Sequence, residues 1–257
     1  MNTTLRIAKL ELNTLFYSPI AWLLSIVFLF QCGLSYTSVL ERLLTYQALG
    51  GMQLQFLNFS TVQVFGFQSG LLGDVLRKIY LYLPLLTMGL ISREISSGTI
   101  KLLYSSPVKV GQIILGKFVA MMAYNLLLVL ILFIFALTCI FNVKSADIGF
   151  IFPGILAIYL LLCTYAAIGL FMSCLTSYQV VAALSTLVVF AILAYIGTIW
   201  QDIDFVRDLT YFLSVTGRAE RMLYGLISTR DVMYFVVIIF IFLSFSFIRL
   251  QSERESR

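Results

Sequence analysis

Long apolar runs separated by short polar segments set the layout of this chain. A helix needs about 20 apolar residues to cross the hydrocarbon core of a bilayer, and about six such runs fit. We expect membrane spans at residues 20–40, 70–92, 111–141, 150–175, 180–200 and 232–249. The pattern predicts an all-α polytopic membrane protein with one transmembrane domain over residues 1–257.

The second span must begin before its unbroken apolar run. Residues 79–92 reach about 21 Å at the helical rise, short of a ~30 Å core. The helix is therefore expected to begin near residues 69–72, which places Asp74, Arg77 and Lys78 in its outer third. Asp74 is spaced to meet both cations. The cations either snorkel to the outer surface or form a collar at an outer mouth that attracts an anionic group.

Three further segments have patterns of their own. Residues 1–18 form apolar and polar faces with a helical period and end before Pro19, which predicts a helix lying in the membrane interface. Residues 41–70 and 201–230 are rich in aromatic residues and interrupted by glycines. These two segments are expected to form short re-entrant or interfacial helices on the extracytoplasmic side.

Composition narrows the function classes. The 257 residues are 61% hydrophobic and 11% charged, which is typical of a membrane protein. The chain has no histidine, which excludes histidine-based catalysis and metal ligation. The predicted spans are almost free of ionisable residues, which disfavours proton-coupled transport and intramembrane hydrolysis. A sodium site built from backbone carbonyls stays open.

The distribution of Lys and Arg predicts the orientation. If both termini are cytoplasmic, the short inner segments hold nine of the 17 basic residues. The higher basic density on that side favours this orientation. The inner basic residues are Arg6, Lys9, Arg93, Lys101, Lys109, Lys117, Arg249, Arg254 and Arg257.

A charged insert at residues 92–107 separates the second and third spans. Ser97 or Thr99 can cap a helix start, and a carboxylate at Glu94 favours a nearby helix N-terminus or pairs with Arg93 or Lys101. The insert predicts a small helix lying across the membrane face, and by itself it equally fits an amphipathic loop on lipid. Its apolar positions recur with a helical period at Ile100, Leu103, Tyr104 and Pro107.

Residues 111–117 match the spacing of a phosphate-binding loop. Phe118 occupies the position of the Mg²⁺-binding hydroxyl, and no predicted strand precedes the segment, so a nucleotide site is disfavoured. We expect instead that Gly116 permits a close helix contact and that Lys117 anchors the cytoplasmic end of the third span.

Together these motifs resemble those of the type-2 ABC exporter permeases. In that family the second span ends in a Glu, followed by Gly-Thr, a short Leu-rich segment, a Pro, and a Gly-Lys that opens the third span. The matching residues here are Glu94, Gly98, Thr99, Leu102, Leu103, Pro107, Gly116 and Lys117. Residues 225–235 further resemble the gliding-motility and Nos-type branch, although the 41–70 segment is longer than that branch leads one to expect.

The resemblance implies a permease subunit of an ATP-driven exporter. It implies no catalytic residue, metal or cofactor in this chain, with ATP and Mg²⁺ bound by a separate cytoplasmic ATPase. The implied partners are cytoplasmic ABC ATPase subunits, a second permease copy or paralogue, a periplasmic or membrane auxiliary protein and membrane lipids, but no nucleic acid. The implied location is the bacterial inner (plasma) membrane.

The resemblance also assigns residues to roles. Residues 92–107 are similar to the family's coupling helix, which docks into a groove on the ATPase. The implied coupling residues are Arg93, Glu94, Gly98, Thr99, Ile100, Leu102, Leu103, Tyr104, Pro107, Gly116 and Lys117. Two alternatives from other classes are a non-transporting scaffold for an extracytoplasmic assembly and an ion channel with carbonyl ligands.

Overall fold

The computed structural model describes residues 3–48, 64–66, 70–105, 108–142, 148–196 and 214–255, and within these ranges the chain is helical with no strand. The all-α prediction is confirmed for this part. The helices are α1 (Thr3–Tyr17), α2 (Pro19–Ala48), α4 (Leu71–Thr87), α5 (Ser92–Ser96), α6 (Ile100–Ser105), α7 (Val110–Asn142), α8 (Ile148–Leu175), α9 (Gln179–Tyr195), α11 (Val215–Leu223) and α12 (Thr229–Glu255).

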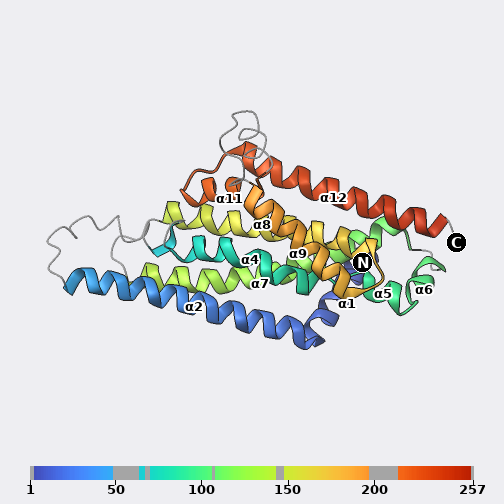
Figure 1. Cartoon of the computed structure of the whole chain (residues 1–257), viewed down its shortest axis with the longest axis horizontal. Helices are drawn as coiled ribbons and strands as arrows, with labels where there is room; N and C mark the ends of the chain where they lie inside the picture. The colour runs from blue at the N-terminus through green and yellow to red at the C-terminus, as the bar shows by residue number, and fades with distance from the viewer. Residues whose placement is uncertain are drawn as a thin grey trace.

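The long helices run along a common axis (Figure 1). Both chain termini lie at one end of the bundle, together with α1, α5 and α6. The other end carries the C-terminus of α2, the N-terminus of α4 and α11. The two ends of the molecule are therefore built from different segments, and we call them the terminal end and the far end.

α8 is the central helix. It packs against α4, α7, α9, α11 and α12, and its side chains are buried on every face between Ala157 and Leu170 except at a few positions. A helix that is apolar all round is stable only when it is surrounded by other helices or lipid. α2 and α12 lie at the rim instead, where Phe30 and Phe240 are 67% and 71% exposed and would contact lipid.

Within the described residues, five segments are long and apolar enough to cross a membrane: Pro19–Arg42, Leu71–Ser96, Val110–Phe141, Gly149–Leu175 and Thr229–Glu255. The second of these segments includes both α4 and α5. α9 has 17 residues, about 26 Å at the helical rise and slightly short of the core. The predicted fifth span reached residue 200, but residues 197–200 lie outside the described part. The protein is thus multi-pass, and the count of six spans stays a prediction.

The first and last residues of α4 and α2 test two predictions about the far end. α4 begins at Leu71, so the prediction from span length that it begins near residues 69–72 is confirmed. The prediction of separate short helices from residue 41 is wrong for residues 41–48, which extend α2. These residues continue the helix because no glycine or proline lies between Leu40 and Gly50. Residues 49–63 and 67–69 lie outside the described part.

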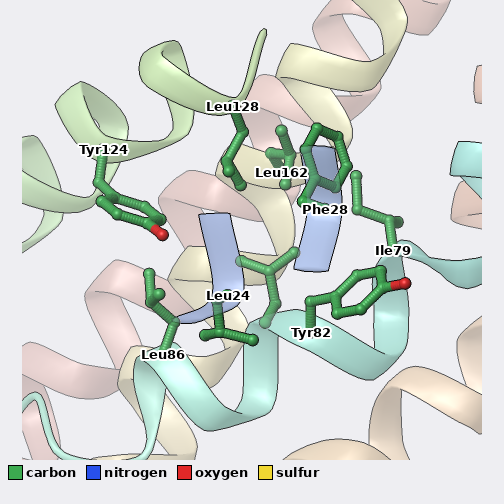
Figure 2. Close-up of a pocket in the computed structure, with 9 residues that line it drawn as sticks. Leu24, Phe28, Ile79, Tyr82, Leu86, Tyr124, Leu128 and Leu162 are labelled. Carbon is green, nitrogen blue, oxygen red and sulfur yellow. The ribbon is translucent and has the colours of Figure 1, made fainter. Parts of the chain in front are cut away.

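The interior of the bundle is tightly filled. Figure 2 shows side chains from α2, α4, α7 and α8 converging on one point, including Leu24, Ile79 and Leu162. The cavity that they leave has a volume of about 10 Å³, which is close to the smallest space that holds one water molecule. This part of the bundle therefore has no room for a transported molecule.

Candidate functional site: a charged junction at the terminal end

A close contact brings α1 onto the start of α7. Gly116 lies on α7 at a point where a Cβ atom would be 2.7 Å from Ile7 Cγ2 and 3.1 Å from the Thr4 carbonyl oxygen. Any larger residue would push α1 away. The expectation that Gly116 permits close helix contact is confirmed, and the partner helix is α1.

This contact places a lysine between two carboxylates. Lys117 Nζ lies 2.8 Å from Glu11 Oε2 of α1 and 2.7 Å from Glu94 Oε1 of α5. The three side chains join α1, α5 and α7, and we call them the charged junction. Arg93 lies at its edge, with one guanidinium nitrogen 3.8 Å from Glu11 Oε1 and with a half-exposed side chain.

The charged junction is buried. Lys117 is 1% exposed and Glu11 is 8% exposed, so the ions have lost most of their hydration. A buried lysine is tolerated when carboxylates at hydrogen-bonding distance replace the water. Lys117 therefore does not anchor the helix at the surface, as we expected from the sequence, and Glu94 pairs with Lys117 rather than with Arg93 or Lys101.

A second contact holds the break between α4 and α5. α4 contains Pro84 and ends at Thr87, so the following backbone groups need other partners. Ser173 of α8 supplies them: its hydroxyl accepts hydrogen bonds from the Ile91 and Ser92 amides, each at 3.0 Å, and donates to the Met88 carbonyl at 2.9 Å. The break has a fixed geometry and is not an unsupported hinge.

The insert between the second and third spans forms two short helices. α5 carries Glu94 and is followed by Gly98, whose φ of 73° lies in the left-handed region that glycine adopts without strain. α6 then begins at Ile100, directly after the predicted capping residue Thr99. The Thr99 hydroxyl lies 2.9 Å from that of Ser97. The expectation of one small helix is therefore corrected to two helices joined at Gly98.

α6 turns one face inward and one face outward. Ile100 is 3% exposed, Tyr104 is half-buried, and Leu102 is 72% exposed. The apolar positions at Ile100 and Tyr104 thus pack against the protein. The face available to another molecule carries Lys101 and Leu102, both exposed. The side chain of Leu103 and the whole of Pro107 lie outside the described part.

The last helix holds the end of α6. Arg254 of α12 donates hydrogen bonds to the Tyr104 carbonyl at 3.0 Å and to the Val108 carbonyl at 3.3 Å. The last carbonyls of a helix have no partner within it, and a basic side chain commonly binds them. Arg254 therefore links both sides of the connection between α6 and α7 to the C-terminal span.

The second predicted cluster lies at the far end. Lys78 Nζ is 2.8 Å from Asp74 Oδ2, so the predicted helical pair forms with Lys78. Arg77 is directed differently: its Nε donates to the Gly73 carbonyl at 3.3 Å. Arg42 of α2 lines the same cleft as these residues. Arg42 was absent from the predicted cluster because nothing in the sequence indicates that this part of α2 packs beside α4.

Sequence reasoning missed Glu11, Ser173 and Arg254 at the terminal end. Glu11 could have been found, because it lies three residues after Ala8 and four before Leu15, within the apolar face of the N-terminal helix. A carboxylate on a buried face needs a cation. The roles of Ser173 and Arg254 depend on contacts with segments more than 80 residues away, and no local pattern marks them.

Comparison with known proteins agrees with this architecture. The sequence profile of a family described as ABC-2 family transporter protein matches residues 5–254, nearly the whole chain. A search of curated proteins found no match.

Proposed function

Because this chain belongs to the ABC-2 transporter family, and its members are transmembrane components, we propose that it is the permease subunit of an ATP-driven exporter whose ATPase is a separate cytoplasmic protein. ATP and Mg²⁺ would bind that partner. The observation that carries the proposal is the exposed face of α6, which projects at the terminal end (Figure 1). The neighbouring segments are held by the ion pairs and hydrogen bonds described above.

Contacts at the terminal end support a path by which a movement of α6 could be passed on. A force on Lys101 and Leu102 would move α6, which is joined to α5 at Gly98. Glu94 of α5 is bound to Lys117 of α7 and, through it, to Glu11 of α1. A movement of α5 therefore reaches two other helices through ionic contacts inside a buried region, where such contacts are strong. Arg254 passes the same movement to α12.

The dense interior favours a path between two permeases. The described bundle leaves about 10 Å³ at the point in Figure 2, so we propose that two copies, or this chain and a paralogue, form the conduit at their seam. The predicted fifth span carries small residues, Ala183, Ala191, Ala194 and Gly197, that would let helices approach closely at this seam. Gly197 lies outside the described residues. Ala183, Ala191 and Ala194 are only half-buried in the described structure, and the most exposed positions of α9 are larger: Val180, Val181, Leu184, Val188, Ile192 and Tyr195.

The proposal also covers the membrane orientation of the protein and its branch within the family. Both termini lie at the terminal end with α6, which fits six crossings with α9 as the shortest and both termini in the cytoplasm of a bacterial cell. The resemblance of residues 225–235 supports the gliding-motility and Nos-type branch. In the structure this segment begins with Gly225, at a φ of 85°, and continues into α12.

The experiment is a coupling assay on α6. The permease is reconstituted with its ATPase, and nucleotide hydrolysis is compared for the wild type, Leu102→Glu and Tyr178→Glu. Leu102 and Tyr178 are 72% and 73% exposed, so neither change should unfold the protein. Tyr178 lies in the turn between α8 and α9 and is the matched control. A variant with a bulky charge at Leu103 is tested in parallel, and it should cut ATPase coupling without abolishing membrane insertion.

The expected result is that Leu102→Glu releases the ATPase or makes its activity independent of the permease, while Tyr178→Glu behaves as the wild type. Normal binding and normal coupling in Leu102→Glu would remove α6 as the docking element. Co-purification of proteins from the extracytoplasmic side alone, with no ATPase, would favour the scaffold alternative.

A further inference from the structure

The last turns of the central helix α8 lie against the break between α4 and α5. Ser173 is fully buried there, and its hydroxyl contacts three backbone groups of one short segment. It accepts hydrogen bonds from the Ile91 and Ser92 amides and donates one to the Met88 carbonyl. A serine hydroxyl offers one donor and two acceptor positions, so these three bonds use its whole capacity.

The three backbone groups belong to the end of one helix and the start of the next. Met88 follows the last residue of α4, and Ile91 and Ser92 are the first two positions of α5. Groups at helix ends have no partner within their own helix. A local side chain commonly caps a helix start, but the side chain of Ile91 does not cap α5. Ser173 supplies contacts from more than 80 residues away, so the geometry of the break depends on α8.

A second contact lies one turn earlier on α8. Gly169 and Ser173 are four residues apart, which places them on the same face of the helix. A Cβ atom at Gly169 would lie 2.6 Å from Thr87 Cβ, so a glycine lets the last residue of α4 approach this closely. Thr87 is itself fully buried. The end of α4 is therefore fixed on α8 by close packing at Thr87 and by the hydrogen bonds of Ser173.

α8 also reaches the far end of the bundle. Gly154, near its other end, lies where a Cβ atom would be 2.6 Å from Leu72 Cδ1 of α4 and 3.3 Å from Leu223 Cδ2 of α11. Close-packed interiors are barely compressible and transmit displacements. A shift of α8 at Ser173 therefore acts on α11, whereas the ion pairs of the charged junction reach α1 and α7 at the terminal end.

We propose that Ser173 is a positioning residue that makes α5 and α8 move as one unit, so that a movement of α5 and α6 reaches the far end through the central helix. This inference rests on the proposed function and adds a second route to the one through Glu94 and Lys117. A serine that only stabilised the break would leave α8 at rest when α5 moves. The two roles therefore differ in what happens to α8 when the ATPase acts.

The test follows α5 and α8 separately in the full chain, reconstituted with its ATPase in lipid nanodiscs. Spin labels are attached at Ser96→Cys of α5 or at Phe152→Cys of α8, each paired with a reference label at Thr37→Cys of α2. These three positions are exposed, and the four native cysteines are buried. Double electron–electron resonance measures the α5–α2 and α8–α2 distances with and without ATP.

In the labelled protein that keeps Ser173, we expect ATP to change both distances. In Ser173→Ala the α5–α2 distance should still change, while the change in the α8–α2 distance should be lost. The matched control is Ser246→Ala, in which a fully buried serine of α12 loses a hydrogen bond to the Phe242 carbonyl of its own helix. This control should keep both changes. In the permease alone, Ser173→Ala should also speed hydrogen exchange at the Ile91 and Ser92 amides.

Ser173→Cys is the second variant if Ser173→Ala does not fold, since a thiol fills a similar space but hydrogen-bonds weakly, and the change at α8 should again fall. An equal change at α8 in Ser173→Ala and Ser246→Ala, or unchanged exchange at the two amides, would overturn the inference. A change at α5 with none at α8 in the protein that keeps Ser173 would do the same. No change at either position in that protein would overturn the proposed coupling function, and this inference with it.

Discussion

The two ends of the bundle use the same kinds of charged residue in opposite ways. At the terminal end, Lys117 is enclosed by Glu11 and Glu94 at 2.8 and 2.7 Å, and its charge is matched and buried. At the far end, Arg42, Arg77, Lys78 and Asp74 line an open cleft, and Asp74 pairs with Lys78 at 2.8 Å. Matched and buried charges hold helices together, because separating them exposes an unpaired ion. Exposed pairs such as Lys78 and Asp74 contribute less to stability, because water and salt screen them.

The largest expected effect is a loss of stability when the charged junction at the terminal end loses its lysine. Lys117→Met leaves the buried Glu11 with only the 3.8 Å contact to Arg93 and leaves the partly buried Glu94 without its cation. Loss of one partner of a buried ion pair costs about 3–5 kcal/mol. We expect a large fall in the thermal unfolding midpoint of the purified protein. Arg93→Met is the control, since the half-exposed Arg93 lies 3.8 Å from Glu11 and such pairs contribute about 1 kcal/mol or less.

A triple variant checks the cause of that effect. Lys117→Met combined with Glu11→Gln and Glu94→Gln removes the charges together, and much of the lost stability should return. A triple variant as unstable as Lys117→Met alone would show that packing, and not charge, holds this end together.

The next largest effect tests the contact that makes the charged junction possible. Gly116→Ala places a Cβ atom 2.7 Å from Ile7 Cγ2, and such overpacking costs about 1–3 kcal/mol. Gly111→Ala is the control on the same helix, because its nearest neighbour is at 3.7 Å. Thermal unfolding should show a loss for Gly116→Ala and little change for Gly111→Ala, and equal midpoints would mean that α1 adjusts freely.

A smaller and local effect is expected at α6. Arg254→Ala removes one hydrogen bond to the Tyr104 carbonyl at the end of α6 and one to the Val108 carbonyl just before α7. Each such bond contributes about 1 kcal/mol. Hydrogen exchange of the amides in residues 100–110 should accelerate, with little change elsewhere. Arg249→Ala, which removes a pair with Glu253 at 3.3 Å on the same helix, should leave that exchange unchanged. Faster exchange in both variants would point to fraying of α12.

The smallest effect on stability is expected at the far end. Asp74→Asn removes a partly exposed pair with Lys78, and the free energy of unfolding should change by about 1 kcal/mol or less. The same measurement used for Lys117→Met checks this. A loss as large as that of Lys117→Met would erase the distinction between the two ends and would make the far cluster a structural one.

The sequence predicted much of the fold because span length and period are local properties. The start of α4 followed from the need to fill a bilayer core, and Leu71 lies where that argument placed it. Gly116 was recognised as a close-contact position, but its partner, α1, could not be named. The insert was predicted as a single helix because the effect of Gly98 on the backbone depends on its φ, which the sequence does not state.

The amino-acid sequence by itself determined the class of the protein, the approximate extent of its helices and the position of the insert, since hydrophobic runs and glycine or proline positions act over a few residues. Only the tertiary structure decided that Lys117 is buried between Glu11 and Glu94, that Ser173 and Arg254 hold α5 and α6, and that Arg42 joins Arg77. These pairings join helices far apart in the chain. Burying a charged or polar group costs free energy, and the group is tolerated only where packing brings a partner of opposite charge or a hydrogen-bonding partner beside it.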